Sequence, residues 1–541
     1  MRALVGVLLS AIGVFVGGTA GRSTGGRHAS WLTPTVLSGP GARGARVAVD
    51  ALGDVTVVWG TADGTDQGMV EAAVRPAGGS FGAAEDVSSP GLWAGPDLGV
   101  DRAGNATVVW ASGDPPNVVV KAATRRTGGR FGPAQNLGGP DTIVSSPRIA
   151  VDARGDAIAT WLASDDPISS TCCYAYVLRA AFRPAGGTFG PAERVLALPA
   201  AEQVPSFKLA MDTKGDTVLV WLASRVPRSF VQAAYRPAGR RFGASKTLAE
   251  ESGQTAPDGQ LAYVDHVDAA IDARGDAVAA WWNAGRIQAS LRPLALGAWR
   301  SPHDLGRPGP CCTGPTVAID AKGNAVVAWA VSPAGTVRAS ALTAGSERWR
   351  TARTLSKPGD RAFSEAPSVV VGARGDVVVA WAANRTSAAI VDAVRPRGGR
   401  FAPAQDVWHG TGFAEGPPQM AVDPQGNTTA VWGATPSPLP RDSHSGYIQA
   451  AGYDAAGPQL RALRIPVFAR AGVVLQLSVS PLDVWSGVSS TRWSFADGAH
   501  AVGQQVQHLY RHPGRYEAIV TSTDRLGNTT RARRVVHVGP R

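Results

Sequence analysis

One phrase recurs eight times along this chain of 541 residues. An apolar run ends in Asp, two residues intervene, a Gly-Asp or Gly-Asn pair follows, and a β-rich run then ends in Trp. Residues 47–59 form the first copy, and the Trp returns at intervals of 48 to 60 residues. A unit of this length is one supersecondary module that must stack on its neighbours to bury its apolar faces. The period therefore predicts a repeat architecture.

The two marker residues are found in nearly every copy. The repeated tryptophans are Trp59, Trp110, Trp161, Trp221, Trp281, Trp329, Trp381 and Trp432. The lead aspartates are Asp50, Asp101, Asp152, Asp212, Asp272, Asp320 and Asp423, and Gly372 replaces the aspartate in the seventh copy. An aspartate before a Gly-Asp turn commonly accepts hydrogen bonds from the turn amides, so we expect it to be structural.

The third copy shows how one repeat is built. Residues 148–152 and 157–161 flank a Gly-Asp turn and read as a hairpin. Residues 177–183 and 189–195 give a third and a fourth strand around a second glycine turn. Four antiparallel strands per repeat form a propeller blade, because the unit is too long for a β-helix coil and lacks helical spacing. The predicted fold class is therefore all-β, with an eight-bladed β-propeller.

The fourth-strand signature places one strand out of order. An aromatic residue opens this strand at Phe81, Phe131, Phe189, Phe242, Trp299, Trp349 and Phe401. An eighth instance, residues 31–37, stands alone before the first hairpin, whereas the last repeat supplies only three strands, the third at residues 447–453. We expect residues 31–37 to complete the last blade and close the ring, because closure removes exposed edges. The alternative gives the last blade its own fourth strand at residues 460–465.

The repeated tryptophans are predicted to pack between adjacent sheets. A buried Trp contributes on the order of 150 to 250 Å² of contact area. Identical placement in every blade favours this packing role over the alternative of a row of sugar-binding tryptophans.

Composition and the N-terminus indicate export. Hydrophobic residues make up 44% of the chain and charged residues 18%, with 65 Gly and 39 Pro, which is typical of a turn-rich globular protein. Residues 1–20 carry a charge, an apolar segment and small residues, the pattern of a signal peptide. An uncleaved anchor is the alternative, although the segment is short for a span of about 20 residues. We expect a secreted or cell-surface protein with no membrane span after cleavage.

From about residue 469 the repeat stops and a different pattern begins. The chain reads Trp493-Ser-Phe495-Ala496-Asp497-Gly498, then has His508 and Tyr510, then Pro513-Gly514-Arg-Tyr516 before an alternating strand. This segment resembles a PKD domain, although Ala496 stands where that family usually has Gly. The resemblance implies an immunoglobulin-like β-sandwich in which His508 and Tyr510 are scaffold residues. The predicted domains are a signal peptide at 1–20, the propeller at 31–460 and the PKD-like sandwich at 465–541.

The repeats differ most in the loops between the second and third strands and between blades. These loops share one face of the ring, and variable loops on a constant scaffold commonly carry recognition. The predicted ligand-binding residues on this variable-loop face are Trp93, Tyr174, Tyr176, Tyr263, Asp265, His266, Trp408 and His409. They suit stacking on sugar rings or holding a peptide; the alternative is that they are ordinary loop aromatics.

All four cysteines lie in adjacent pairs, Cys172-Cys173 and Cys311-Cys312. An exported chain is expected to hold them oxidised. Disulfides between sequence neighbours are the simplest outcome, and bridging the two pairs would require Cα atoms within about 7 Å. A zinc site is the remaining alternative, but the usual Cys-x-x-Cys spacing is missing. No metal and no cofactor are predicted.

Charge and motif content narrow the function. The net charge of +11 comes mostly from dispersed arginines, so the sequence shows no basic stripe with stacking aromatics and no nucleic-acid partner is expected. Weak attraction to acidic polymers remains open. We predict a monomeric module that binds a polysaccharide or a surface protein without catalysis. The alternatives are a polysaccharide hydrolase or lyase using acids such as Asp165, Asp166 or Asp265, and a purely structural surface protein.

Overall fold

The computed structural model describes residues 29–541 except 63–67, 92, 142, 165–175, 198–202, 226–227, 253–265, 284, 308–313, 332–333, 363–365, 385–386, 411 and 436–445. The chain divides into two compact units, with Ser30–Ala455 forming the first and Ala456–Arg541 belonging to the second. Both consist of strands, and the described residues contain one short 3-10 helix, Leu294–Leu296. No helix in this part of the chain has the length and apolarity needed to cross a membrane.

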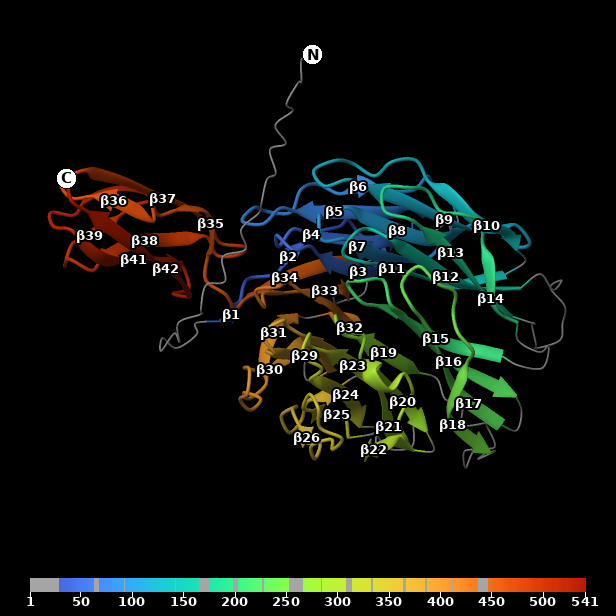
Figure 1. The fold of residues 1–541 in the computed structure, drawn as a ribbon. Helices are drawn as coiled ribbons and strands as arrows, with labels where there is room; N and C mark the ends of the chain where they lie inside the picture. Colours follow the sequence, from blue (N-terminus) through green and yellow to red (C-terminus); the bar gives the residue numbers. More distant parts are fainter. Residues whose placement is uncertain are drawn as a thin grey trace, which may run out of the picture. The chain divides into compact units, whose positions relative to one another are not determined.

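Ser30–Ala455 folds into eight antiparallel sheets whose strands follow one another in sequence order (Figure 1). Sheet 1 holds β3 (Ala42–Val49), β4 (Val55–Thr61), β5 (Val70–Arg75) and β6 (Glu85–Asp86); sheet 2 holds β7 (Trp93–Val100), β8 (Ala106–Ser112), β9 (Val118–Arg125) and β10 (Gln135–Asp141). Sheet 3 holds β11 (Ile143–Val151), β12 (Ala157–Ser164), β13 (Val177–Arg183) and β14 (Glu193–Ala197); sheet 4 holds β15 (Gln203–Met211), β16 (Thr217–Arg225), β17 (Arg228–Arg236) and β18 (Lys246–Ser252).

The remaining sheets repeat the same order. Sheet 5 holds β19 (Val267–Ile271), β20 (Ala277–Asn283), β21 (Arg286–Arg292) and β22 (His303–Gly306); sheet 6 holds β23 (Thr316–Ile319), β24 (Ala325–Val331), β25 (Thr336–Leu342) and β26 (Arg353–Thr354). Sheet 7 holds β29 (Val377–Asn384), β30 (Ala388–Arg395) and β31 (Gln405–Gly410), and its first strand is split into β27 (Arg361–Ala362) and β28 (Ser368–Val371). Sheet 8 holds β32 (Phe413–Val422), β33 (Thr428–Thr435) and β34 (Tyr447–Asp454).

Sheet 8 takes its outer strand from the other end of the chain. β1 (Ser30–Trp31) and β2 (Thr35–Val36) both pair antiparallel with β34, with Trp31 opposite Tyr453 and Thr35 opposite Ala450 (Figure 1). The rings of Trp31 and Tyr453 lie 5.3 Å apart. The predicted pairing of residues 31–37 with the last repeat is thus confirmed. The alternative is wrong, because β35 (Gln459–Arg464) pairs with a strand of the C-terminal unit.

Neighbouring sheets meet through their first strands. β3 contacts β7, and the same contact is repeated from sheet to sheet through β11, β15, β19, β23, β28 and β32. β32 of sheet 8 also contacts β3 of sheet 1. The repeated four-stranded sheets therefore have a propeller-like arrangement.

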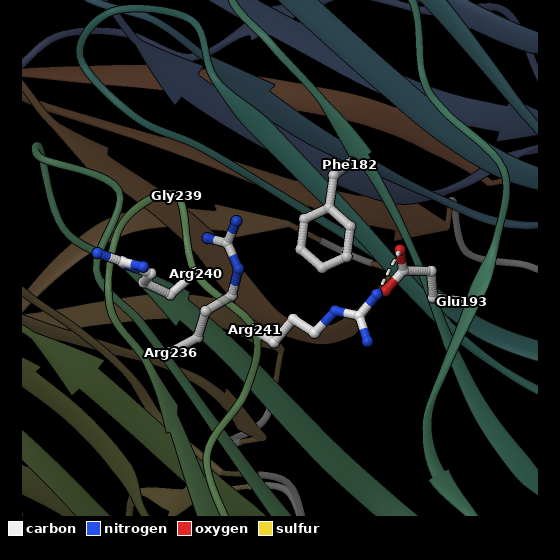
Figure 2. A pocket seen from close by; sticks show the side chains of 6 residues that line it. All are labelled: Phe182, Glu193, Arg236, Gly239, Arg240 and Arg241. Carbon is white, nitrogen blue, oxygen red and sulfur yellow. Dashed lines mark ion pairs between the residues drawn. The ribbon is translucent and has the colours of Figure 1, made fainter.

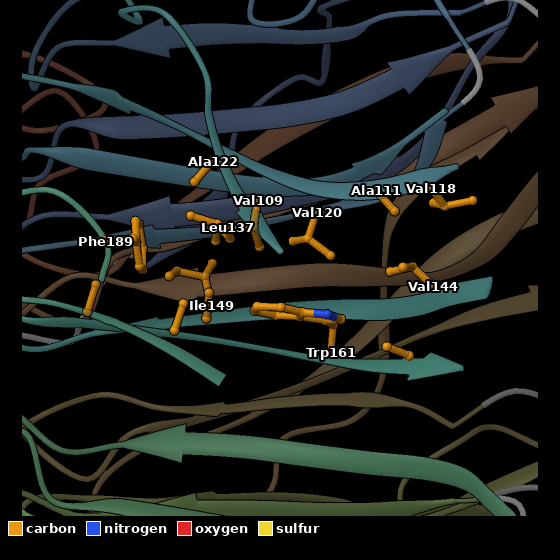
Figure 3. Packing of buried hydrophobic residues seen from close by; sticks show 14 residues of the cluster. Val109, Ala111, Val118, Val120, Ala122, Leu137, Val144, Ile149, Trp161 and Phe189 are labelled. Atoms are coloured by element: carbon orange, nitrogen blue, oxygen red, sulfur yellow. The ribbon is translucent and has the colours of Figure 1, made fainter. Parts of the chain in front are cut away.

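The repeated tryptophans lie between these sheets. All eight are at most 2% exposed. Figure 3 shows one instance, in which Trp161 of sheet 3 lies beside Val109 and Val120 of sheet 2 and Ile149 of its own sheet. The predicted packing role is confirmed, and rings buried to this extent are not available to stack on a sugar.

The lead aspartate builds the first turn of each repeat. Asp50 Oδ1 accepts the backbone N–H groups of Leu52 and Asp54 at 2.8 and 2.9 Å, and every other lead aspartate bonds the corresponding two amides. The predicted structural role is therefore confirmed. In the seventh copy Gly372 keeps only the backbone part of the turn, because it has no side-chain acceptor.

The residue after the turn glycine joins two turns. Asp54 Oδ1 accepts the backbone N–H of Ala77, in the turn between the third and fourth strands, at 2.7 Å. The Asp or Asn at this position makes the equivalent bond in all eight repeats. Asp and Asn share this Oδ1 acceptor, which explains why the sequence alternates between Gly-Asp and Gly-Asn. The first-to-second and third-to-fourth turns are thereby fixed together on one face, here called the constant face.

The fourth strand begins later than predicted. In the third repeat it starts at Glu193, whereas the sequence placed its start at Phe189. Phe189 is buried and its N–H is bonded to the side chain of Gln135 in sheet 2, and Pro191 has no N–H to give to a ladder. The aromatic therefore anchors the turn to the neighbouring sheet before pairing starts.

The C-terminal unit is a sandwich of two sheets. One holds β35, β37 (Val474–Leu482) and β40 (Gln505–Leu509); the other holds β36 (Phe468–Arg470), β42 (Thr529–Gly539), β41 (Gly514–Asp524), β38 (Val488–Phe495) and β39 (His500–Val502). Residues of both sheets form one core around Trp493, Phe495 and Tyr510. This agrees with the predicted β-sandwich.

Replacing Asp423 tests the role of the lead aspartate. Its Oδ1 accepts three backbone N–H groups and its Oδ2 accepts the amide of Asn427, and burial raises the pKa of its carboxyl. Asp423→Ala leaves those donors without an acceptor and should lower the free energy of unfolding by about 1–3 kcal/mol, measured by urea denaturation. Asp423→Asn keeps the Oδ1 acceptor and should lose clearly less. Equal losses in the two variants would contradict the assigned role.

Candidate functional site

Several of the residues predicted to bind ligand lie outside the described residues. These are Tyr174, Tyr263 and Asp265, together with the side chain of Trp93, whose backbone begins β7. The four cysteines, Cys172, Cys173, Cys311 and Cys312, and the acids Asp165 and Asp166 also lie outside them. Their roles remain predictions.

The other four candidates are distributed over three sheets. Tyr176, just before β13 of sheet 3, is half-buried and packs against the apolar cluster around Trp221. Trp408 in β31 of sheet 7 is half-buried, with its ring 6.1 Å from that of Trp432. His409 and His266 are exposed. Tyr176 and Trp408 thus contribute to packing, and the two histidines are accessible to a ligand.

Two of the cavities that the described residues form lie between neighbouring sheets. One, of about 440 Å³, lies between sheets 3 and 4 and is lined by Phe182, Glu193, Arg236, Gly239, Arg240 and Arg241 (Figure 2). It is called cleft 3/4 below. The other, of about 350 Å³, lies between sheets 6 and 7 and is called cleft 6/7. Its charged lining residues are Arg350, Arg353, Arg395 and Arg400.

Cleft 3/4 combines cation–π stacking with one ion pair. The guanidinium carbon of Arg236 lies 4.6 Å from the ring centre of Phe182 on the preceding sheet. Arg241 reaches toward Glu193, with 4.0 Å between the closest nitrogen and oxygen (Figure 2). Burial lowers the pKa of Arg236, and the charges of Asp156 and Asp216 oppose this shift. A partly buried cation and an aromatic ring thus line the same opening.

Cleft 6/7 carries more positive charge. Arg395 lies at the end of β30, and its guanidinium carbon is 5.4 Å from the ring centre of Phe401. Burial lowers the pKa of Arg395, the charge of Arg350 lowers it further, and Asp320 opposes both. Arg350, Arg353 and Arg400 are exposed at the opening. A negatively charged group entering this cleft would meet four guanidinium groups.

Both clefts belong to the constant face. Cleft 3/4 lies beside the β17–β18 turn, which Asp216 fixes through the N–H of Ala238 at 2.8 Å. Cleft 6/7 lies beside the β30–β31 turn, which Asp376 fixes through the N–H of Arg397 at 2.7 Å. The uniform turns of this face predicted a scaffold role for it. A usable signal was the charge of the residues beside the fourth-strand aromatic, which changes from repeat to repeat.

The chemistry of these clefts suits binding. Arginine stays protonated at any physiological pH and offers five donors in a planar fork, so it binds carboxylate, sulfate or phosphate groups in bidentate fashion. The same high pKa makes it unsuited to proton transfer near neutral pH. Stacking on Phe182 or Phe401 restricts the orientation of the guanidinium. These sites can therefore hold an anionic group in a fixed place.

The carboxyl with the most altered titration is far less accessible. Asp392 in β30 is fully buried, and burial raises its pKa to about 6, with the nearby Trp31 indole and Gln405 side chain partly opposing the shift. Its carboxylate oxygens have no hydrogen-bond partner among the described residues. A perturbed pKa is a common mark of catalysis, but a group with no access to solvent cannot meet a substrate. Asp392 therefore affects the stability of the fold rather than a substrate.

Comparison with known proteins identifies the C-terminal unit. Residues 463–538 match the family model for the PKD domain. This unit carries a PKD domain. Its β38 ends at Phe495, which stacks on His508 at 3.8 Å, and Asp497 lies 2.9 Å from His508 Nε2. Tyr510 is buried in the core of the PKD domain, so His508 and Tyr510 are scaffold residues as predicted. The Ala496 departure leaves the sandwich intact.

No curated protein sequence matches the chain. Similar solved structures include a puromycin hydrolase, at 16% identity and a TM-score of 0.41, covering 80% of this chain and 62% of the hydrolase. The chain thus spans less than two thirds of that protein's length. The BP39L lectin from Burkholderia pseudomallei has 12% identity and a TM-score of 0.46, covering 68% of this chain and 100% of the lectin. The NanB sialidase from Streptococcus pneumoniae has 8% identity and a TM-score of 0.38, covering 78% and 94%.

Replacing Asp392 should change the pH dependence of stability. Its folded pKa of about 6 lies above its ordinary 3.8, so its contribution to stability is full below about pH 4 and is lost as pH rises past 6. This loss is roughly 3 kcal/mol. Asp392→Ala should remove this step. The variant should therefore have a larger free energy of unfolding than the wild type at pH 7, and the difference between them should be smaller at pH 4, as measured by urea denaturation at both pH values. All seven other repeats carry Ala here, namely Ala72, Ala122, Ala180, Ala233, Ala289, Ala339 and Ala450.

The result is read from the difference in free energy of unfolding between variant and wild type at each pH, because other carboxyls also titrate in this range. A difference that does not vary with pH would show that the carboxyl is not desolvated as described.

Proposed function

We propose that this protein is an exported binding module that recognises a glycan at the cell surface or outside it, without catalysis. The observation that carries the proposal is the pair of arginine-lined clefts between neighbouring sheets. Each cleft places guanidinium groups beside an aromatic ring, Phe182 in one and Phe401 in the other. Sugars carrying acidic groups present the anions that match these guanidinium groups.

The scaffold of this module is a closed eight-bladed propeller. The contact between β32 and β3 and the pairing of β1 and β2 with β34 support closure. In a closed ring no sheet edge of the first and last blades remains free for aggregation, and clefts recur at a fixed spacing. Several weak sites on one rigid body bind a repeating polymer more tightly than any of them binds a single unit.

Export is part of the proposal. It rests on the N-terminal signal pattern of residues 1–20 and on the PKD domain, a domain that accompanies secreted enzymes and surface proteins. An extracellular location would bring the clefts into contact with surface polysaccharides.

The variable-loop face remains a second predicted recognition surface. Of the residues predicted to bind ligand there, His266 of sheet 5 and His409 of sheet 7 are described and exposed. A hydrolase or lyase would need carboxyl groups converging within about 5 to 9 Å at one opening. The acids predicted for that role, Asp165, Asp166 and Asp265, lie outside the described residues. Analysis of reaction products therefore tests the enzymatic alternative directly.

A binding screen with parallel product analysis tests the proposed function. The purified mature chain should bind one or more immobilised polysaccharides on a glycan array and release no reducing ends from them. His409→Ala and Arg236→Ala separate the two faces, because loss of binding only in the Arg236 variant places recognition on the constant face. Release of products that stops in Asp165→Ala or Asp265→Ala would overturn the non-catalytic proposal. Binding to no glycan at all would overturn the glycan proposal.

A further inference from the structure

Equivalent positions between other neighbouring sheets on the constant face carry internal ion pairs. Arg130 precedes the aromatic of sheet 2 and lies 3.9 Å from Glu85, four residues after the aromatic of sheet 1. Arg241 and Glu193 hold the same positions in sheets 4 and 3, at 4.0 Å. In both pairs, the arginine just before the aromatic of one sheet is matched by the glutamate four residues after the aromatic of the preceding sheet.

A second pairing crosses between sheets 5 and 6. Arg300 directly follows Trp299 of sheet 5, and its guanidinium bonds the carboxylate of Glu347, two residues before Trp349 of sheet 6. Arginine after the aromatic is therefore matched by glutamate two residues before the next aromatic. Each of these cations has its anion within the protein.

Cleft 6/7 retains both arginines and lacks both acids. Arg400 precedes Phe401 as Arg241 precedes Phe242, but the position of Glu193 is occupied by Arg353. Arg350 follows Trp349 as Arg300 follows Trp299, but the position of Glu347 is occupied by Gly399. Arg353 thus adds a further cation in place of one acid, and Gly399, which has no side chain, stands in place of the other.

The resulting charge is not neutralised within the described part of the chain. No ion pair there joins Arg350, Arg353, Arg395 or Arg400 to a carboxylate. The charge of Asp320 acts on Arg395 and raises its pKa, opposing burial. Its own oxygens are occupied by Lys322 N–H, Asn324 N–H and the Asn324 side chain. Four guanidinium groups therefore repel one another around an open volume.

We propose that cleft 6/7 binds the carboxylate or sulfate groups of an acidic polysaccharide, which take the place of the two missing glutamates. This deepens the proposed function by naming the ligand class and the site. Arg353 of sheet 6 and Arg400 of the β30–β31 turn of sheet 7 line the same cleft, and an anion bound by both would also join the two sheets.

The form of the cleft favours a polysaccharide over a nucleic acid. Its volume of about 350 Å³ suits one or two sugar rings. Single-stranded nucleic acid is held by a basic track with free aromatic faces for base stacking. Here the arginines gather in one cleft, and the ring of Phe401 is already covered by Arg395.

Restoring a missing acid tests the inference. Arg353→Glu introduces the residue found at the same position in sheets 1 and 3, so the fold should be retained, and circular dichroism and the melting temperature check this. The full mature chain should bind polygalacturonate and dextran sulfate in a salt-dependent manner, measured by calorimetry. Arg353→Glu should weaken both affinities roughly tenfold or more, and Gly399→Glu should act in the same direction. Arg194→Glu is the matched control, because it makes the same charge change on the fourth strand of sheet 3.

The outcomes separate this inference from the proposed function. Equal weakening by Arg353→Glu and Arg194→Glu would mean a general charge effect and would overturn the site. Binding to uncharged dextran or another neutral glycan that Arg353→Glu leaves intact would overturn the inference while the proposed function stands. Cleavage of polygalacturonate with the site still required would overturn the non-catalytic proposal alone. Binding of single-stranded DNA as tight as that of polygalacturonate would overturn the assignment to polysaccharide.

Discussion

Packing of an indole ring between neighbouring sheets is the interaction on which the first unit depends. Each sheet has an apolar face that cannot be buried within one repeat, and the repeated Trp fills the space between that face and the next sheet. A side chain of this size fixes the separation of the sheets, so the clefts at their edges have a defined width. Clefts lined by residues of two sheets, such as cleft 3/4, depend on this separation.

Hydrogen bonds from the turn carboxylates then position the cleft residues. The Asp or Asn after each turn glycine holds the third-to-fourth turn, and the residues of that turn lead directly to the arginine before the aromatic. The backbone is thus nearly identical in each repeat while the side chains at the opening vary. Each turn bond joins a backbone N–H to the Oδ1 of the Asp or Asn after the turn glycine. The other side chains of the turn take no part in this bond, so their charge can differ between repeats while the turn stays the same.

The distribution of charge over this face gives the repeats different chemistry. Where Glu85 or Glu193 faces an arginine, the two charges offset one another and little attraction for an external anion remains. Where Arg353 replaces that acid, the same scaffold becomes a cluster of like charge. Such a cluster is unfavourable in the free protein, and relief of the repulsion by a bound anion contributes to affinity. Function on a repeat scaffold can therefore arise from a single change of charge in one copy.

The sequence by itself determined the repeat, the four-stranded sheets, the burial of the eight tryptophans, the pairing of residues 31–37 with the last repeat and the C-terminal sandwich. These follow from periodicity and side-chain size, which are local and recur in every copy. Only the tertiary structure decided that Phe189 anchors a turn before its strand begins, that Asp392 is buried beside Trp31, and that Arg350, Arg353, Arg395 and Arg400 share one cleft. Those relations join residues of different sheets, and their distances depend on how the sheets pack rather than on their spacing along the chain.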